Sequence, residues 1–279
     1  MPAPESYAAD LALLIDAALG AGEIARRHFR NRPKVWDKGD GQGPVTEADL
    51  AVNDHLNAVL TAARPGYGWL SEESDSLADP HRQGAEATFV IDPIDGTRAF
   101  IDGQPGFAHA LAVVRDRRAV AGVVHLPMLD LTYGATLGGG ATLNGAPIRA
   151  SQRVEADGAS VLAARPALDP NQWPGGMPAL KRHFRPSLAW RLALVAEGRF
   201  DAMLTIRDAW DWDVAGASLI ATEAGATVTD RAGNPLRFNG PKMRSPGVIA
   251  APAALHARLL AGLNAPMREP PVLPSPRRS

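Results

Sequence analysis

Residues 89–97 read FVIDPIDGT, an apolar run followed by an acidic turn. The apolar residues predict a buried strand that delivers Asp92 to its C-terminal end, and the proline after it fixes the turn. Asp95 comes three residues later, so both carboxylates can converge on one point. Oxygen ligands of this kind favour Mg²⁺, Mn²⁺ or Ca²⁺ over zinc. Gly96 and Thr97 then open a helix whose free N–H groups can bind a phosphate oxygen.

Two aspartates three residues apart are, in isolation, more often an acidic turn with a helix cap than a metal site, so the prediction depends on further acidic residues. Glu72 and Glu73 end a neighbouring strand in the segment GWLSEES, residues 68–74. Adjacent carboxylates at the mouth of a sheet repel one another unless a cation offsets them. The alternative for this pair is a solvated loop.

Two more acidic groups have structural alternatives. Asp49 lies three residues after Thr46, which matches a capping box at the start of a helix. Asp213 precedes the run VAGASLIA of residues 214–221, and either it or Asp211 can serve as the N-cap of that helix. The residues alone leave the capping and functional roles of these aspartates open.

The pattern along the chain predicts two α/β lobes, residues 1–150 and 151–263. In the first lobe, amphipathic helices at 8–30 and 47–64 precede a mainly antiparallel sheet. Its strands are expected in GWLSEES, in ATFVIDPIDGT and at residues 108–115, 119–125 and 131–136, with a hairpin at Asn144-Gly145. In the second lobe we expect strands at 160–164, 201–205 and 247–251 and helices at 178–184, 187–197, 214–224 and 252–263. Residues 264–279 are rich in proline, and we expect a disordered tail.

The composition limits the classes of function. The chain has 279 residues, and 29 basic against 30 acidic residues give a net charge of −1, which argues against a nucleic-acid polymer as partner. Cysteine is absent, which excludes disulfides, thiolate nucleophiles and cysteine zinc sites. No stretch approaches the ~20 apolar residues that span a bilayer, and the start has no basic leader, so we expect a cytoplasmic protein without a membrane partner.

Four motifs in order resemble the inositol monophosphatase superfamily of Mg²⁺-dependent, lithium-sensitive phosphatases. They are V-T-x-x-D at 45–49, E-E-S at 72–74, D-P-I-D-G-T at 92–97 and W-D-V-A-G at 212–216. The last two are highly specific as a pair. The resemblance covers residues 11–260 and implies a two-lobed α-β-α-β-α sandwich of mixed α+β and α/β character. It also implies that a homodimer can form.

The resemblance implies a set of metal ligands. Glu72, Asp92 and the backbone carbonyl of Ile94 would bind one Mg²⁺, and Asp92, Asp95 and Asp213 would bind a second. Two or three Mg²⁺ per site are implied, with Mn²⁺ as a substitute. Such paired cations neutralise phosphoryl oxygens and activate water, so the chemistry requires no nucleophilic side chain.

The resemblance also implies roles around those ligands. Thr97, paired with Asp49, would orient and deprotonate the attacking water, so Asp49, Thr97 and Glu72 are the predicted catalytic residues. The amides of Gly96 and Thr97 would hold the phosphate. Lys38 occupies the basic position that the family usually has before the second helix.

The resemblance implies that the substrate is a small phosphorylated metabolite. The residues expected at the rim of the pocket predict which one. The segment RFDAMLTIRDAWD would bring Arg207, Asp208 and Trp210 to that rim, with core packing as the alternative for Trp210. Its surroundings resemble the bacterial 3′(2′),5′-bisphosphate nucleotidase branch, which acts on adenosine 3′,5′-bisphosphate. Residues 95–101, which read DGTRAFI, resemble the bacterial histidinol-phosphate phosphatases of the same superfamily. Residues 205–206 lack the carboxylate with which inositol-specific members grip their substrate.

The nucleotidase is therefore placed first, before the alternatives of a histidinol-phosphate phosphatase and an inositol-1-monophosphatase. A hypothesis of another class is a non-catalytic protein that binds a phosphorylated metabolite. Two departures from the family pattern stand out, Gly43 in place of an acidic residue and Pro186 in place of glycine. Neither is among the implied ligands.

Overall fold

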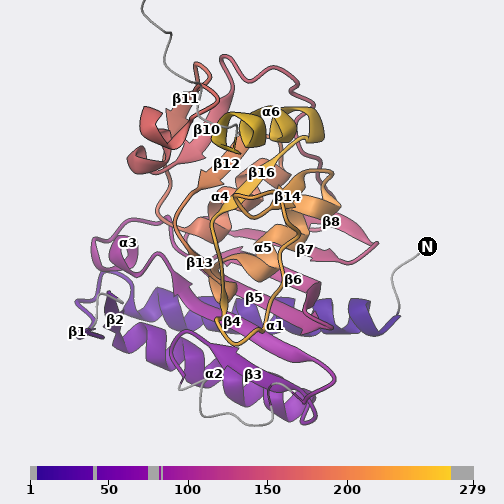
Figure 1. The fold of residues 1–279 in the computed structure, drawn as a ribbon. Coiled ribbons are helices and arrows are strands. Elements are labelled where there is room, and N and C mark those ends of the chain that lie inside the picture. Colours follow the sequence, from indigo (N-terminus) through magenta and orange to yellow (C-terminus); the bar gives the residue numbers. More distant parts are fainter. Residues whose placement is uncertain (1–4, 40–42, 75–81, 83, 265–279) are drawn as a thin grey trace, which may run out of the picture.

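The computed structural model describes residues 5–39, 43–74, 82 and 84–264. Helices and sheets alternate in five layers, as Figure 1 shows from bottom to top. The outer helical layers are α1 (Glu5–His28) with α2 (Glu47–Ala63) on one side and α6 (Ala253–Asn264) on the other. This order confirms the predicted α-β-α-β-α sandwich. The proline-rich tail from residue 265 onward lies outside the described residues.

Seven strands form the first sheet, which lies against α1 and α2. They are β3 (Gly68–Ser71), β4 (Thr88–Asp95), β5 (Ala108–Arg115), β6 (Arg118–Leu126), β7 (Leu131–Thr136), β8 (Gly140–Leu143) and β9 (Ala146–Pro147). They pair in chain order, and only β3 and β4 run parallel. The predicted mainly antiparallel sheet is confirmed. Parallel pairing of β3 and β4 brings the carboxyl ends of both strands to one edge.

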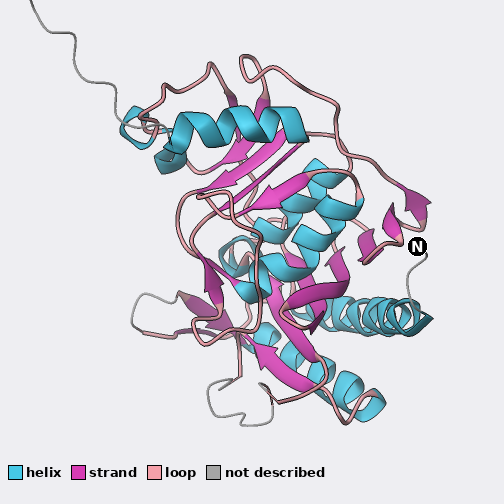
Figure 2. Cartoon of the chain, turned by 45° about the vertical axis from the view of Figure 1, so that its right-hand side comes forward, coloured by secondary structure: helices cyan, strands magenta, loops and turns pink. Residues whose placement is uncertain are grey.

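Five strands form the second sheet, which lies under α6 (Figure 2). They are β10 (Ser160–Ala163), β11 (Lys181–His183), β12 (Ala202–Thr205), β14 (Thr227–Thr229) and β16 (Val248–Ala251), in the order β11-β10-β12-β16-β14. Short two-stranded pieces pair β1 (Val35–Asp37) with β2 (Pro44–Thr46), and β13 (Ala209–Trp210) with β15 (Arg244–Ser245).

The helix predicted for residues 178–184 is wrong. These residues contain β11, which pairs in parallel with Ser160–Leu162 at the edge of the second sheet. Pro178 and Pro186 bound a segment too short for a stable helix, and backbone pairing with β10 gives its N–H and C=O groups partners instead.

Two helices form the middle layer between the sheets, α4 (Leu188–Ala196) and α5 (Asp211–Glu223). Both are largely buried, because each has a sheet on either side. α5 contacts β5, β6 and β7 of the first sheet as well as β14 of the second. Because the halves share this layer, the division at residue 150 stays a prediction.

A glycine pair sets the distance between α5 and the first sheet. A Cβ atom on Gly216 of α5 would lie 2.4 Å from the carbonyl oxygen of Leu111, and one on Gly122 of β6 would lie 2.7 Å from Gly216 Cα. Backbone therefore packs directly on backbone, which only glycine allows. This contact fixes the first turn of α5, and with it Asp213, beside the end of β4.

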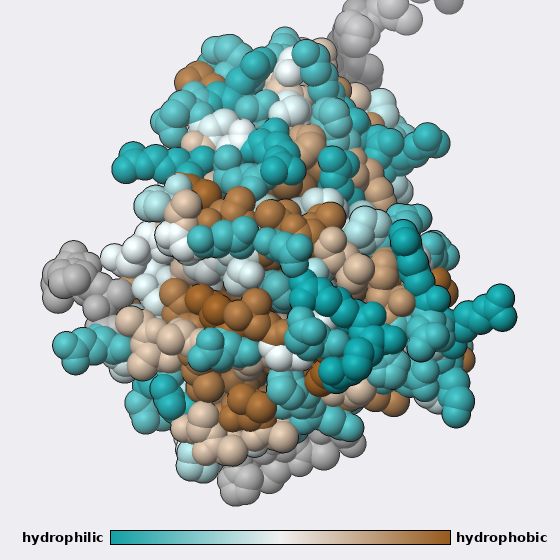
Figure 3. Space-filling view, turned by 180° about the vertical axis from the view of Figure 1, so that it is seen from behind, coloured by the Kyte–Doolittle hydropathy of each residue, from teal (hydrophilic) through white to brown (hydrophobic). Residues whose placement is uncertain are grey.

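The surface of the described residues carries apolar patches. Figure 3 shows the back of the molecule, where apolar side chains gather in patches with hydrophilic side chains between them. Among the described residues, no helix is long and apolar enough to cross a membrane. The structure describes a single copy of the chain, so the homodimer implied by the resemblance stays a prediction.

Candidate active site

The acidic turn after β4 is an irregularity in the sheet. Asp92 pairs with Ala110 and Asp95 with Ala108 of β5, and the register shifts between these two pairs, so the two residues between the aspartates leave the regular strand pairing. Gly96 follows with a φ of 101°, which glycine adopts without strain, and caps the short helix α3 (Thr97–Ile101). The predicted strand, turn and helix start are confirmed.

A buried histidine is hydrogen-bonded to the backbone of this turn. His109 of β5 is fully buried, and its Nδ1 donates a hydrogen bond to the carbonyl of Pro93. Burial lowers the pKa of His109 to about 3, so the ring is neutral and Nδ1 carries its proton. The turn between the two aspartates is therefore fixed by a side chain that sequence patterns do not single out.

The neutral state of His109 makes stability depend on pH. Its pKa is lower in the folded chain than the ordinary 6.5, so its contribution is full above pH 6.5 and is lost as pH falls toward 3. His109→Asn keeps a donor near Pro93 and removes the titration. We expect the free energy of unfolding of wild type to fall relative to this variant by roughly 3 to 5 kcal/mol between pH 6.5 and 3.

Urea unfolding at several pH values measures this difference. His183→Asn, at an exposed position of β11, is the control and should follow wild type. Parallel pH curves for His109→Asn and wild type would contradict the prediction.

Three carboxylates meet at the end of β4. One oxygen from each of Glu72, Asp92 and Asp213 lies within 4.8 Å of the others. Asp92 is buried and its Oδ1 has no hydrogen-bond partner within the described part of the chain, whereas Glu72 and Asp213 are partly exposed. Burial raises the pKa of Asp92 well above its ordinary value, and the charges of Glu72, Asp95 and Asp213 raise it further. Burial, Asp95 and Glu72 likewise raise the pKa of Asp213. The cluster therefore favours an added positive charge.

Asp95 joins the cluster to the middle helical layer. Its Oδ2 accepts hydrogen bonds from Ser187 Oγ at 2.7 Å and from the amide of Ala189 at 2.6 Å. Ser187 is the N-cap of α4, and its Oγ also accepts from the amide of Trp190. Asp95 thus caps α4 through space, across 92 residues of sequence. It is not one of the three mutually closest carboxylates.

Asp49 caps a helix and also contacts Thr97, and its catalytic role stays a prediction. With Thr46 it forms the predicted capping box of α2, accepting the Thr46 amide at 2.8 Å. Its other oxygen, Oδ1, lies 3.3 Å from Thr97 Oγ1, which is also 3.1 Å from the carbonyl of Ile94. Burial raises the pKa of Asp49 to about 6, although the hydrogen bonds from Thr46 oppose the shift.

The side chain of Lys38 forms ion pairs with both Glu72 and Glu73. Its Nζ is 2.8 Å from Glu72 and 2.6 Å from Glu73. Burial raises the pKa of Glu73 to about 7, and the nearby charge of Glu72 adds to that shift while Lys38 opposes it. Glu73 therefore accepts a cation or a proton readily, so the solvated-loop alternative does not hold for this pair.

In α5, neither Asp211 nor Asp213 is the N-cap, which is Trp210. Asp211 is buried and accepts the amide of Asn239 at 2.7 Å. Asp213 instead faces the acidic cluster. The sequence alternative of a simple cap is wrong for both aspartates.

A pocket of about 420 Å³ opens beside Glu72 and Thr97. Among the described residues its walls come from the loops before α2 and α3 and from the segment before α4. They include Glu72, Gly96, Thr97, Arg98, Phe184 and Pro186, with Gly43 and Pro44. Sequence reasoning missed Phe184, because its segment was assigned to a helix.

The structure does not bring the predicted rim residues into this pocket, since Arg207, Asp208 and Trp210 are absent from its described walls. All three are exposed. Trp210 stacks on Trp212 with ring centroids 4.8 Å apart, and Arg244 lies over its ring and 3.6 Å from Asp208. Their role in binding stays a prediction.

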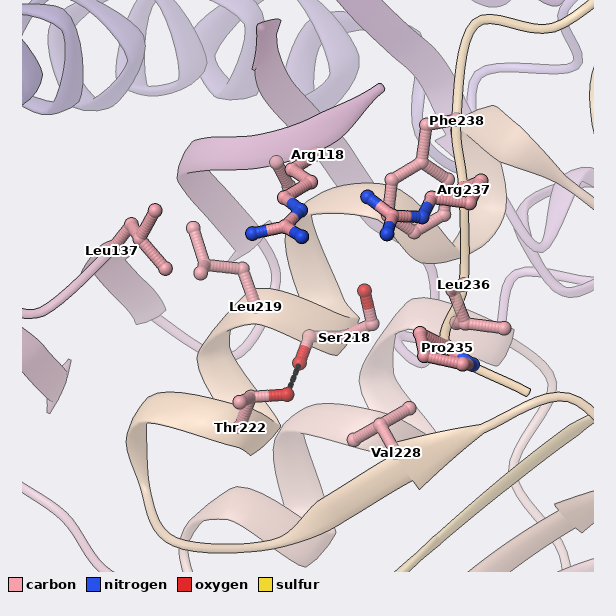
Figure 4. Close-up of a pocket in the computed structure, with 11 residues that line it drawn as sticks. Arg118, Leu137, Ser218, Leu219, Thr222, Val228, Pro235, Leu236, Arg237 and Phe238 are labelled. Carbon is pink, nitrogen blue, oxygen red and sulfur yellow. Dashed lines mark hydrogen bonds between the residues drawn. The ribbon is translucent and has the colours of Figure 1, made fainter. Parts of the chain in front are cut away.

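A second pocket, of about 240 Å³, lies between α5, β14 and the loop at residues 235–238 (Figure 4). Its described walls are mostly apolar, with the guanidinium groups of Arg118 and Arg237 at one side. They include no carboxylate, so the described walls of this pocket lack the negatively charged oxygen ligands of a Mg²⁺ site.

Comparison with known proteins agrees with the geometry. The sequence matches the inositol monophosphatase family over residues 7–268. The chain belongs to this family. Its members are phosphatases, so the resemblance of the four motifs is confirmed, and this chain is a phosphatase-family hydrolase.

Relatives with different named activities have similar sequence identities to this chain. The inositol-1-monophosphatase of Mesorhizobium japonicum is 30% identical, over 92% of this chain and 97% of that protein. The 3′(2′),5′-bisphosphate nucleotidase CysQ of Aggregatibacter actinomycetemcomitans is 33% identical, over 81% and 86%. The structure of the extragenic suppressor protein SuhB from Bartonella henselae superimposes with a TM-score of 0.79 at 27% identity, over 92% and 99%. The comparisons therefore establish the family of this chain, but they do not identify its substrate.

Proposed function

We propose that this chain is a Mg²⁺-dependent phosphomonoesterase that hydrolyses the 3′-phosphate of a nucleoside 3′,5′-bisphosphate such as adenosine 3′,5′-bisphosphate. The observation that carries the reaction class is the convergence of Glu72, Asp92 and Asp213 to within 4.8 Å, beside a pocket of suitable size. Histidinol phosphate and inositol 1-phosphate are the alternatives for the same reaction.

The cluster fits a hard divalent cation. All of its donors are oxygens, Asp92 Oδ1 is buried without a hydrogen-bond partner among the described residues, and burial together with the neighbouring carboxylates raises the pKa values of Asp92 and Asp213. Glu72, Asp92, Asp213, Asp95 and the Ile94 carbonyl are the groups that would hold Mg²⁺. When bound, the cations supply positive charge that neutralises phosphoryl oxygens and makes an attacking water more acidic.

The chain's own residues supply the remaining steps. Asp49 at neutral pH is a carboxylate of raised basicity, and its contact with Thr97 Oγ1 suits it to take a proton from water held by Thr97. Gly96 and Thr97 line the pocket where their amides can bind the phosphate. Lys38 fixes Glu72 and offsets part of the negative charge while the site is free of cation.

Phosphate release from three substrates tests the proposal. With Mg²⁺ we expect kcat/KM to be highest for adenosine 3′,5′-bisphosphate, ahead of histidinol phosphate and inositol 1-phosphate. EDTA should abolish the activity, because no side chain replaces the cation, and Mn²⁺ should restore part of it. Release that persists after EDTA would contradict the metal mechanism.

The class of a non-catalytic binding protein is tested by the same measurement. If the chain binds phosphorylated metabolites in calorimetry but releases no phosphate from any of the three esters, that alternative replaces the enzyme.

A further inference from the structure

One aromatic ring lies exposed at the mouth of the candidate active site. Phe184 sits between β11 and α4, is 48% exposed, and lines the same pocket as Glu72 and Thr97. Burying an aromatic ring stabilises a fold, so a ring left half open in a pocket wall is available to a ligand. Phe184 belongs to none of the hydrophobic core clusters of the described residues, so packing of the core does not account for its position.

A buried arginine holds this ring in place. Arg191 of α4 is only 8% exposed, and its guanidinium carbon lies 4.4 Å from the Phe184 ring centroid. Its Nε donates to the carbonyl of Arg185 at 2.6 Å and its terminal nitrogen to the carbonyl of Pro186 at 3.2 Å. The guanidinium therefore covers one face of the ring and fixes the backbone that follows it.

The groups of the reacting end line the same pocket. Gly96 and Thr97 lie there with Glu72 of the acidic cluster. A substrate whose phosphate is held at Gly96 and Thr97 has its organic part in the remaining space, which Phe184 and Pro186 enclose. The face of Phe184 that Arg191 does not cover is the apolar surface available to that part.

We infer that Phe184 is a stacking platform for the organic part of the substrate, and that the site takes phosphate esters that carry a planar heteroaromatic ring, a nucleobase above all. This inference rests on the proposed function and deepens it. Base stacking on a protein aromatic ring is tolerant of the identity of the base, because every base has a π-face. The platform lies on the segment before α4 rather than at Trp210, where the sequence placed the aromatic contact.

The ratio of two kcat/KM values isolates the ring. Adenosine 3′,5′-bisphosphate carries a base and glycerol 2-phosphate carries none, so their ratio cancels effects on the cations. Phe184→Ala should lower this ratio by about tenfold, mostly through a higher KM for the nucleotide. Phe184→Trp, which restores an aromatic face, should keep the ratio within about twofold of wild type. Histidinol phosphate as a third substrate separates an imidazole ring from a nucleobase.

The control is Met177→Ala, at an exposed apolar side chain outside the pocket walls, which should leave the ratio unchanged. Equilibrium binding of adenosine 5′-monophosphate with Mg²⁺, measured by calorimetry, is the second readout, and Phe184→Ala should weaken it by about tenfold.

The outcomes separate this inference from the proposed function. Turnover with a ratio unchanged in Phe184→Ala overturns the platform and leaves the phosphatase intact. Absence of turnover on every ester, with nucleotide binding that still depends on Phe184, overturns the proposed function and supports the platform. Absence of both turnover and nucleotide binding overturns both.

Discussion

Replacing Asp92 by Asn is expected to abolish phosphate release and, in the cation-free protein, to raise thermal stability. Asp92 is the buried member of the cluster, and its Oδ1 has no partner among the described residues. An amide keeps one oxygen but replaces the other by an NH₂ group and carries no negative charge, so the site loses one oxygen ligand and the charge of its buried carboxylate. We expect at least about a thousandfold lower kcat/KM, because the reaction then lacks its main source of positive charge.

The gain in stability follows from electrostatics. Burial and the charges of Glu72, Asp95 and Asp213 raise the pKa of Asp92 in the folded chain, so its ionised form opposes folding above the ordinary pKa of 3.8. The neutral amide removes that cost. The melting temperature in EDTA should therefore rise at pH 7, and the gain should fade as pH falls toward 4. Mg²⁺ should stabilise wild type but not the variant.

Differential scanning calorimetry with and without Mg²⁺, together with phosphate release, measures all three effects. Asp54→Asn, at an exposed position of α2, is the matched control. It should change neither phosphate release nor the melting temperature, with or without Mg²⁺. Activity of Asp92→Asn within tenfold of wild type would show that Asp92 is not a ligand. A lower melting temperature in EDTA would show that its carboxylate is stabilising.

Much of this site was predictable because its signals are local. The strand that carries Asp92 and Asp95, the positive φ at Gly96 and the capping box at the start of α2 each depend on a few neighbouring residues. Such patterns predict the folded structure well, because the local backbone conformation requires these residue types at these positions. The layered fold and the antiparallel first sheet followed from periodicity and from the four motifs.

The remaining features depend on residues far apart in the sequence. The cap that Asp95 gives to α4 joins residues 95 and 189, and no local pattern indicates it. The strand β11 forms only because β10 offers an edge, so the helix predicted there was wrong. That error hid Phe184, since a ring on a helix of the second lobe would not have been assigned to the pocket.

Gly216→Ala is expected to damage both the fold and the site, although alanine is the better helix former by about 1 kcal/mol. The new Cβ would lie 2.4 Å from the carbonyl oxygen of Leu111, where ordinary contacts begin at 3.4 Å. Both partners are backbone of packed elements, so α5 must move away from the sheet by about 1 Å. We expect the free energy of unfolding to fall by about 2 to 3 kcal/mol.

The same displacement should reach the chemistry, because Asp213 lies one turn before Gly216 on α5. A misplacement of about 1 Å can lower a rate by about a hundredfold, and we expect a loss of that order in kcat with weaker activation by Mg²⁺. Urea unfolding and Mg²⁺ titration of the rate measure the two effects. Gly66→Ala, whose Cβ meets nothing within 4 Å, is the control. If Gly216→Ala loses stability but keeps its Mg²⁺ dependence, the position of α5 does not set that of Asp213, and the close contact serves packing alone.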